Sequence, residues 1–277
     1  IAVNGYLDDV EIKEIHIEED PGKYDLKKGL VDYNRAGTPL IEVVTKPVIK
    51  SEEHAERFLR KFERGLIYYD ILKEHGTVKA DANISISGYE RVEIKNINSF
   101  ENVARALRYE IKRQKELIEN NGKIERETRH FDEASGKTIR LRKKEREEDY
   151  RYILDPDLMP ININLSFINE FDENPFIRFE RLKKEISEEC AYVITEEKEL
   201  SNFYEWLSKF FDKKDLSNWI KGQLKKQLNY RNLKFRKANI EKEEIKTLLN
   251  AFFSGKISDD AMEKLLISYL DKKEPIS

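Results

Sequence analysis

Two segments contain acidic side chains that could bind a metal ion. Glu42 lies inside an otherwise apolar strand, where a carboxylate either faces water or is paired for a function. The other segment lies where a predicted strand ends, and it contains His16, Glu18, Glu19 and Asp20. Neighbouring carboxylates repel one another, so they persist where water or a hard cation such as Mg²⁺ compensates them. The residues alone leave open a solvated acidic turn with a structural histidine, or a metal site.

A second polar set lies on two consecutive predicted strands. Alternation along residues 78–87 puts Asp81 and Asn83 on one face. The next strand carries Glu93 and Lys95, which lie beside them if the two strands form a hairpin. The lysine could then meet a phosphate, and the carboxylates could meet Mg²⁺. The alternative is a wetted outer face held by cross-strand ion pairs.

Four arginines lie within ordered segments of the same half. Their planar guanidinium groups suit phosphate recognition, and surface ion pairing is the alternative. The sequence contains no glycine-rich Walker loop, so an ATP site here must be built without one. The four are Arg35, Arg129, Arg142 and Arg151.

A basic segment lies in the second half of the chain. Residues 216–240 contain seven basic side chains and no acidic one, with Trp219, Tyr230 and Phe235 interleaved. In a chain of net charge −3, this local field predicts a contact with an RNA backbone. The alternative is a solvated helix face whose aromatic side chains belong to the core. The basic residues are Lys221, Lys225, Lys226, Arg231, Lys234, Arg236 and Lys237.

The elements that must position these residues follow from hydrophobic periodicity. The first half alternates strands and helices, which predicts an α+β fold with an antiparallel sheet covered on one face by helices. Strand signals end near residue 163, and helical periodicity continues to the end of the chain. We therefore predict an α+β domain over residues 1–163 and an all-α tail over residues 164–277. The predicted strands cover residues 1–6, 10–18, 30–34, 40–45, 78–87, 91–96, 123–130 and 138–142, and the predicted helices begin at Ser51 and Ser99 and cover 175–189, 197–211, 216–230, 242–253 and 259–270.

Composition sets wider limits. The single cysteine, Cys190, excludes an internal disulfide and favours a reducing, cytoplasmic location. No apolar stretch approaches the roughly 20 residues that cross a bilayer. A charged fraction of 38% with abundant lysine and glutamate is typical of heat-adapted proteins. Because the chain starts at Ile1, inside a strand and without methionine, we expect it to be a fragment.

Read together, nine segments resemble the GatB/GatE family of tRNA-dependent amidotransferase subunits. They occur in the family's order, cover nearly the whole chain, and are specific as a set. The segments are His16–Lys23, Leu30–Glu42, Asp81–Ser85, Glu93–Phe100, Glu127–Arg129, Asp149–Tyr152, Asp155–Asp157, Thr195–Leu200 and Ser254–Ser258.

The resemblance implies a cradle-shaped catalytic domain, similar to the glutamine synthetase fold, followed by a tRNA-binding helical tail. It implies a ligase that uses ATP and Mg²⁺ to phosphorylate the side-chain carboxylate of glutamate or aspartate esterified to tRNA(Gln) or tRNA(Asn). Ammonia from a partner amidase then displaces the phosphate. The implied partners are this amidase, which is the A subunit of the amidotransferase, and the small C subunit. The implied location is the cytoplasm.

The resemblance also assigns roles to residues. It carries the metal site to Glu19, Glu42 and Glu18, and we expect the first two to converge on one cation at the sheet surface. From facing geometry and motif membership, Asp81 and Glu93 are predicted as further metal or nucleotide ligands. The remaining predicted nucleotide and phosphate partners are Lys95, Arg35, Asn96, Asn83 and Arg129.

Three alternatives remain open. GatE, the archaeal paralogue, carries a large insert that the 40 or so residues between Asp155 and Thr195 cannot hold, which favours the GatB branch. A non-catalytic tRNA-binding scaffold would use the basic segment alone. A metal-dependent hydrolase would use the carboxylates without tRNA.

Two parts of the family pattern are not found in this sequence. One is an upstream segment that adds a glutamate and a histidine to the metal site, and the other is the end of the tail.

Overall fold

The computed structural model describes residues 2–20, 22–25, 28–72, 76–95, 97–143 and 173–272. The chain divides into two units, which are described separately. The first comprises Ile1–Glu63 and Thr77–Ile153, and the second Arg64–Gly76 and Leu154–Ser277. The boundary predicted between residues 163 and 164 lies outside the described residues. The sequence did not predict that residues 64–76 belong to the helical unit.

An antiparallel sheet in the order β1–β2–β5 begins the first unit. The predicted hairpin of β1 and β2 is confirmed, and Asp8 in its turn takes a left-handed conformation with φ 53°. β5 pairs with the other side of β2, whose register shifts by one residue between Ile12 and Glu14, as in a β-bulge. The strands of this sheet, and of the separate β3–β4 hairpin, are β1 (Ala2–Leu7), β2 (Val10–Glu19), β5 (Pro39–Thr45), β3 (Lys23–Asp25) and β4 (Leu30–Asp32).

A four-stranded sheet in the order β6–β7–β8–β9 completes the strands of the unit. The predicted α+β class is confirmed, but this sheet is mixed, because β7 and β8 run parallel. The helix α2 (Phe100–Glu119) connects them and returns the chain to the starting end of β7, as a parallel pair requires. The strand predicted over residues 78–87 is reduced to three residues. The strands are β6 (Ala82–Ile84), β7 (Val92–Lys95), β8 (Glu127–Asp132) and β9 (Lys137–Lys143).

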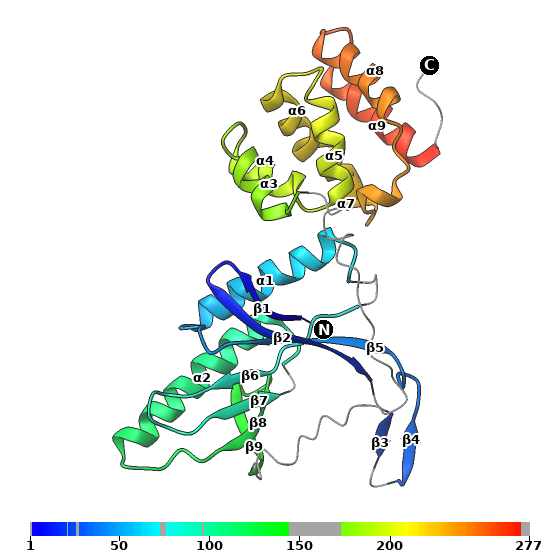
Figure 1. The fold of residues 1–277 in the computed structure, drawn as a ribbon. Helices are drawn as coiled ribbons and strands as arrows, with labels where there is room; N and C mark the ends of the chain where they lie inside the picture. Colours follow the sequence, from blue (N-terminus) through cyan, green and yellow to red (C-terminus); the bar gives the residue numbers. More distant parts are fainter. Residues whose placement is uncertain are drawn as a thin grey trace. The chain divides into compact units, whose positions relative to one another are not determined.

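α2 packs against one face of this sheet (Figure 1), and α1 (Glu52–Tyr68) contributes side chains to the same core. α1 and α2 begin where predicted, because the hydroxyls of Ser51 and Ser99 accept hydrogen bonds from backbone N–H groups in the first turn of each helix. Their apolar stripes meet the inward side chains of the strands in one core. It contains Ala55, Ala82, Ile94, Ile97, Val103, Ala106, Leu107 and Phe131.

The second unit is helical in its described part, as predicted. The predicted helix over residues 175–189 is two helices, because the Ser187 hydroxyl caps a new helix by accepting from the Cys190 N–H. The predicted helix over residues 216–230 contains a π-helical turn, Ile220–Leu224. No helix in the described part of the chain is long and apolar enough to cross a membrane. The helices are α3 (Pro175–Leu182), α4 (Glu188–Ile194), α5 (Lys198–Leu207), α6 (Lys213–Trp219), α7 (Lys225–Tyr230), α8 (Lys242–Phe253) and α9 (Asp259–Lys272).

Candidate nucleotide and metal site

The face of the β6–β9 sheet opposite the helices carries the second polar set. Asn83 on β6 pairs with Glu93 on β7, so these two side chains share a face with Asp81 and Lys95. The Lys95 Nζ atom lies 3.1 Å from Asp81 Oδ2 and 3.5 Å from Glu93 Oε1. The structure therefore brings the four residues together as the alternation predicted. Their roles toward a nucleotide stay predictions.

Thr128 is a member of this face that the sequence did not reveal. Parallel pairing places it opposite Glu93, and its Oγ1 donates a 3.1 Å hydrogen bond to Glu93 Oε2. Thr128 is 1% exposed and Glu93 is 8% exposed, so the contact is shielded from water. The sequence signal was only its position in the motif Glu127-Thr-Arg129. The register that gives it a role depends on the parallel pair, which periodicity does not predict.

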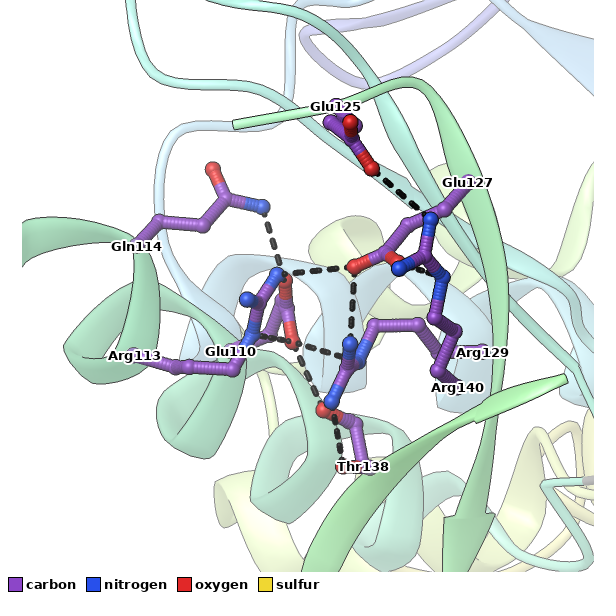
Figure 2. A network of polar contacts seen from close by, with 8 residues as sticks. All are labelled: Glu110, Arg113, Gln114, Glu125, Glu127, Arg129, Thr138 and Arg140. Carbon is purple, nitrogen blue, oxygen red and sulfur yellow. Dashed lines mark hydrogen bonds and ion pairs between the residues drawn. The ribbon is translucent and has the colours of Figure 1, made fainter. Parts of the chain in front are cut away.

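The structure does not bring Arg129, which was predicted to bind nucleotide, to the polar face of the sheet. Arg129 pairs with Ile94, whose side chain lies in the core, so it projects to the helix side of the sheet and away from Glu93. There its Nη1 atom lies 2.7 Å from Glu127 Oε1, and its Nε donates to Thr138 Oγ1 at 2.9 Å (Figure 2). The Arg129 guanidinium therefore links β8 to β9 on the helix-covered face of the sheet.

The other predicted phosphate partners are only partly described. Arg35 lies in the segment between β4 and β5 and forms an ion pair of 2.7 Å with Asp20, with its side chain 61% exposed. This contact ties the end of β2 to that segment, and the phosphate role of Arg35 stays a prediction. Asn96, Arg151 and the side chain of Arg142 lie outside what the structure describes.

The first acidic set divides between the two faces of the β1–β2–β5 sheet. Glu42 pairs with His16, and Glu18 lies two residues further along β2, so these three side chains share one face. Glu19 is adjacent to Glu18 and therefore projects to the opposite face. The predicted convergence of Glu19 with Glu42 is wrong, because a one-residue step along a strand reverses the side chain. The sequence comparison behind that prediction carried motif positions but no strand register.

Glu18 and Glu42 form a close carboxylate pair. Partial burial, and then the charge of Glu42 and a hydrogen bond to it, raise the pKa of Glu18 above its usual value. A cation between the two groups would relieve this repulsion. Among the described residues, no group of three or more histidine, cysteine, aspartate or glutamate side chains could hold a metal ion. Two carboxylates still fit Mg²⁺, which usually binds to one or two carboxylates together with substrate phosphates and water.

The basic segment of the helical unit is largely neutralised by carboxylates. Lys225 is almost buried, with its Nζ atom 2.9 Å from Glu196 and 3.1 Å from Glu197. Trp219 and Phe235 belong to the core, whereas Tyr230 is 87% exposed. The local positive field expected from the sequence is therefore reduced, although Lys234 and Lys237 are exposed. The further ion pairs are Lys221–Glu189, Lys226–Glu263, Arg231–Asp271 and Arg236–Asp70.

Comparison with known proteins agrees with this architecture. The family model described as the GatB/GatE catalytic domain matches residues 1–169, and the one described as the GatB domain matches residues 201–277. A protein of Methanopyrus kandleri is 41% identical over 292 aligned residues, which cover 100% of this chain and 62% of that protein. Proteins of Methanosphaera stadtmanae and Methanobrevibacter smithii are 38% and 41% identical, covering 96% of this chain and 60% of each relative.

All three relatives are named as the B subunit of an aspartyl/glutamyl-tRNA(Asn/Gln) amidotransferase. The chain spans about three fifths of their length. The two family models cover most of the chain, in the order that the sequence motifs predicted, and their boundaries agree with a sheet-containing first part and a helical second part. The chain belongs to the GatB/GatE family.

Proposed function

We propose that this chain provides the site at which a carboxylate esterified to tRNA is activated by ATP for amidation. The substrates are glutamate on tRNA(Gln), aspartate on tRNA(Asn), or both. Membership of the family and the names of the relatives support this proposal. The structural observation that carries it is the Lys95 ammonium group, which lies between the carboxylates of Asp81 and Glu93 on the sheet face opposite the helices.

The reaction needs two displacements. A carboxylate is a poor electrophile, so one of its oxygens first attacks the γ-phosphorus of ATP, the bond to ADP breaks, and an acyl phosphate forms. The nitrogen of ammonia then attacks the acyl carbon, the bond to phosphate breaks, and a proton passes to solvent or a base as the amide forms. Ammonia comes from the glutaminase reaction of the amidase partner, the A subunit, in a complex that also contains the small C subunit.

In this proposal the basic residue Lys95 binds phosphate, and the acidic residues bind either Lys95 or Mg²⁺. Lys95 offers donors to a phosphate oxygen, and Asp81 and Glu93 keep the ammonium group at the sheet surface. Glu18 and Glu42 are the carboxylates that fit Mg²⁺, which when bound would offset the charge of the phosphates. Glu19, on the opposite face, has no part in this proposal.

The experiment measures amidation directly. The chain, in its natural full-length form and mixed with its amidase partner, is incubated with glutamine, ATP and Glu-tRNA(Gln) or Asp-tRNA(Asn). We expect ADP and amidated tRNA in equal amounts for at least one substrate. Lys95→Gln should lower the rate of ADP formation by about 100-fold, a loss comparable to that of one charge-stabilising donor. Lys112→Gln, on the exposed surface of α2, is the matched control and should leave the rate unchanged.

Two outcomes would reject the proposal. A non-catalytic scaffold would bind charged and uncharged tRNA equally well and form no ADP. A metal-dependent hydrolase would cleave small phosphoesters in the absence of tRNA. The neutralised state of most of the basic segment weighs against the scaffold, because that function depends on the segment alone.

A further inference from the structure

A buried polar network lies behind the strand that carries Thr128. At its centre is Glu110 on α2, which is 0% exposed. The Glu110 carboxylate accepts hydrogen bonds from Arg113 Nη2 at 2.5 Å, Gln114 Nε2 at 2.9 Å and Thr138 Oγ1 at 2.7 Å (Figure 2). A buried carboxylate with three donors and close guanidinium groups is satisfied, so it fixes the elements that supply those groups.

Two β8 residues join this network on either side of Thr128. Arg129 reaches Glu110 Oε2 at 3.5 Å and donates to Thr138 on β9 through two of its nitrogens. Glu127 accepts from Arg129 at 2.7 Å, and its second oxygen lies 2.8 Å from Arg140 Nε. The side chains before and after Thr128 therefore anchor β8 to α2 and β9 on the helix-covered face of the sheet.

On the other side of the sheet, the alternation of β8 turns Thr128 toward Glu93. The hydroxyl meets Oε2 of Glu93, while Oε1 is the atom nearest to Lys95. Because β8 is anchored at the residues before and after Thr128, the hydroxyl donor has a fixed position, and Oε2 of Glu93 has a defined partner. The two oxygens of Glu93 are thereby given different surroundings before any ligand arrives.

We propose that Thr128 is a positioning residue of the nucleotide site, which acts through Glu93. The inference rests on the proposed function. It adds that the Thr128 hydroxyl holds Glu93 so that Oε1 is directed toward Lys95 and a bound magnesium–nucleotide. Because Glu18 and Glu42 are the carboxylates that fit the cation, the effect of Thr128 on Mg²⁺ binding passes through Glu93 and Lys95 to the phosphates of the magnesium–nucleotide. Residues that orient the groups around a metal typically change metal affinity by 10- to 100-fold when they are removed.

A structural role alone would give a different result, and the test separates the two. The full-length protein with its amidase partner is titrated with Mg²⁺ at fixed ATP and Glu-tRNA(Gln), and the thermal midpoint of each variant is measured alongside. Thr128→Val, which replaces the hydroxyl by a methyl group, should raise the half-saturating Mg²⁺ concentration by about 10-fold. Thr128→Ser keeps the donor and should recover most of that loss. Thr247→Val, which removes an exposed hydroxyl from α8, is the matched control.

The action through Glu93 is tested by a double-mutant cycle. In a Glu93→Gln background, Thr128→Val should cause less than a twofold further change in the half-saturating Mg²⁺ concentration. If Thr128→Val does not fold, Thr128→Ala takes its place in the same cycle. Binding of Mg²⁺ with a non-hydrolysable ATP analogue, measured by calorimetry, provides a readout that does not depend on turnover.

The results distinguish this inference from the proposed function. A wild-type complex that forms no ADP and binds no magnesium–nucleotide rejects both. An active wild type together with a Thr128→Val variant of unchanged Mg²⁺ dependence rejects the role of Thr128 alone. A variant that loses thermal stability in proportion to its activity, or an effect that persists fully in the Glu93→Gln background, also rejects it.

Discussion

Glu18 and Glu42 project from neighbouring strands to the same face of the β1–β2–β5 sheet. The register places Glu42 opposite His16, and Glu18 follows two residues later on β2. The adjacent Glu19 projects to the other face, although it belongs to the same acidic motif. This arrangement identifies which carboxylates can meet one cation, and it gives the two neighbours on β2 opposite expectations.

Removing the charge of Glu18 or Glu42 should weaken the dependence on Mg²⁺, and removing that of Glu19 should not. Glu42→Gln and Glu18→Gln are each expected to raise the half-saturating Mg²⁺ concentration of the full-length complex by about 10-fold or more, because the cation loses a charged oxygen ligand. Glu19→Gln is the control in the same motif and should stay within about twofold of wild type. A larger effect of Glu19→Gln than of Glu42→Gln would refute this division.

The buried network should contribute to the stability of the first unit. Glu110→Gln keeps the shape of the side chain but removes one of the two carboxylates that Arg113 and Arg129 share, the other being Glu127. The variant should lose on the order of 3 kcal/mol, as expected when one partner of a buried ion pair is removed. Because the chain has two units, hydrogen exchange of α2 and β8 amides, followed by mass spectrometry, reports this loss locally. Glu116→Gln, exposed on the same helix, should have almost no effect.

The same carboxylate should make this stability depend on pH. Burial alone would raise the pKa of Glu110, but hydrogen bonds from Arg113, Gln114 and Thr138 outweigh it and hold the pKa below the ordinary value of 4.5. A lowered pKa in the folded state means that the contribution is complete above pH 4.5 and is lost as pH falls through the folded pKa. The difference in unfolding free energy between wild type and Glu110→Gln should therefore shrink on acidification. An increasing difference would show that the network does not hold the charged form.

Replacing Lys225 or Lys234 of the basic segment by glutamine should have different effects on stability and on tRNA binding. Burial alone would lower the pKa of Lys225, but Glu196 and Glu197 raise it above its usual value, so the lysine serves the fold. Lys225→Gln removes hydrogen bonds to two carboxylates and should destabilise the helical unit by about 2 kcal/mol, measured by urea unfolding with the fluorescence of Trp206 and Trp219. Lys234→Gln should leave that stability unchanged.

Lys234 is the residue of the basic segment to test for RNA contact. If Lys234 contacts a phosphate, Lys234→Gln should lower the slope of log affinity for tRNA against log salt by about 0.9. An unchanged slope would remove Lys234 from the interface.

Much of the fold followed from local sequence patterns. The first hairpin, the two capped helices of the first unit and the change to helices in the second half depend on alternation, capping and 3.6-residue periodicity, all of which act over short distances. The grouping of Asp81, Asn83, Glu93 and Lys95 was also predictable, because a hairpin with strict alternation fixes which side chains are neighbours.

The tertiary structure decided what the partners of these elements are. The parallel pairing of β7 with β8 turns Thr128 toward Glu93 and Arg129 toward Glu110. Neither contact is visible from spacing, since the partners are 35 and 19 residues apart. Family motifs preserved residue types but not strand faces, so Glu19 was placed with Glu42 when Glu18 holds that position. The run of lysines and arginines likewise read as a free positive surface, because the carboxylates that neutralise it come from other helices. A sequence determines elements through local geometry, while the face and the charge that each residue presents depend on which distant strand or helix packs against it.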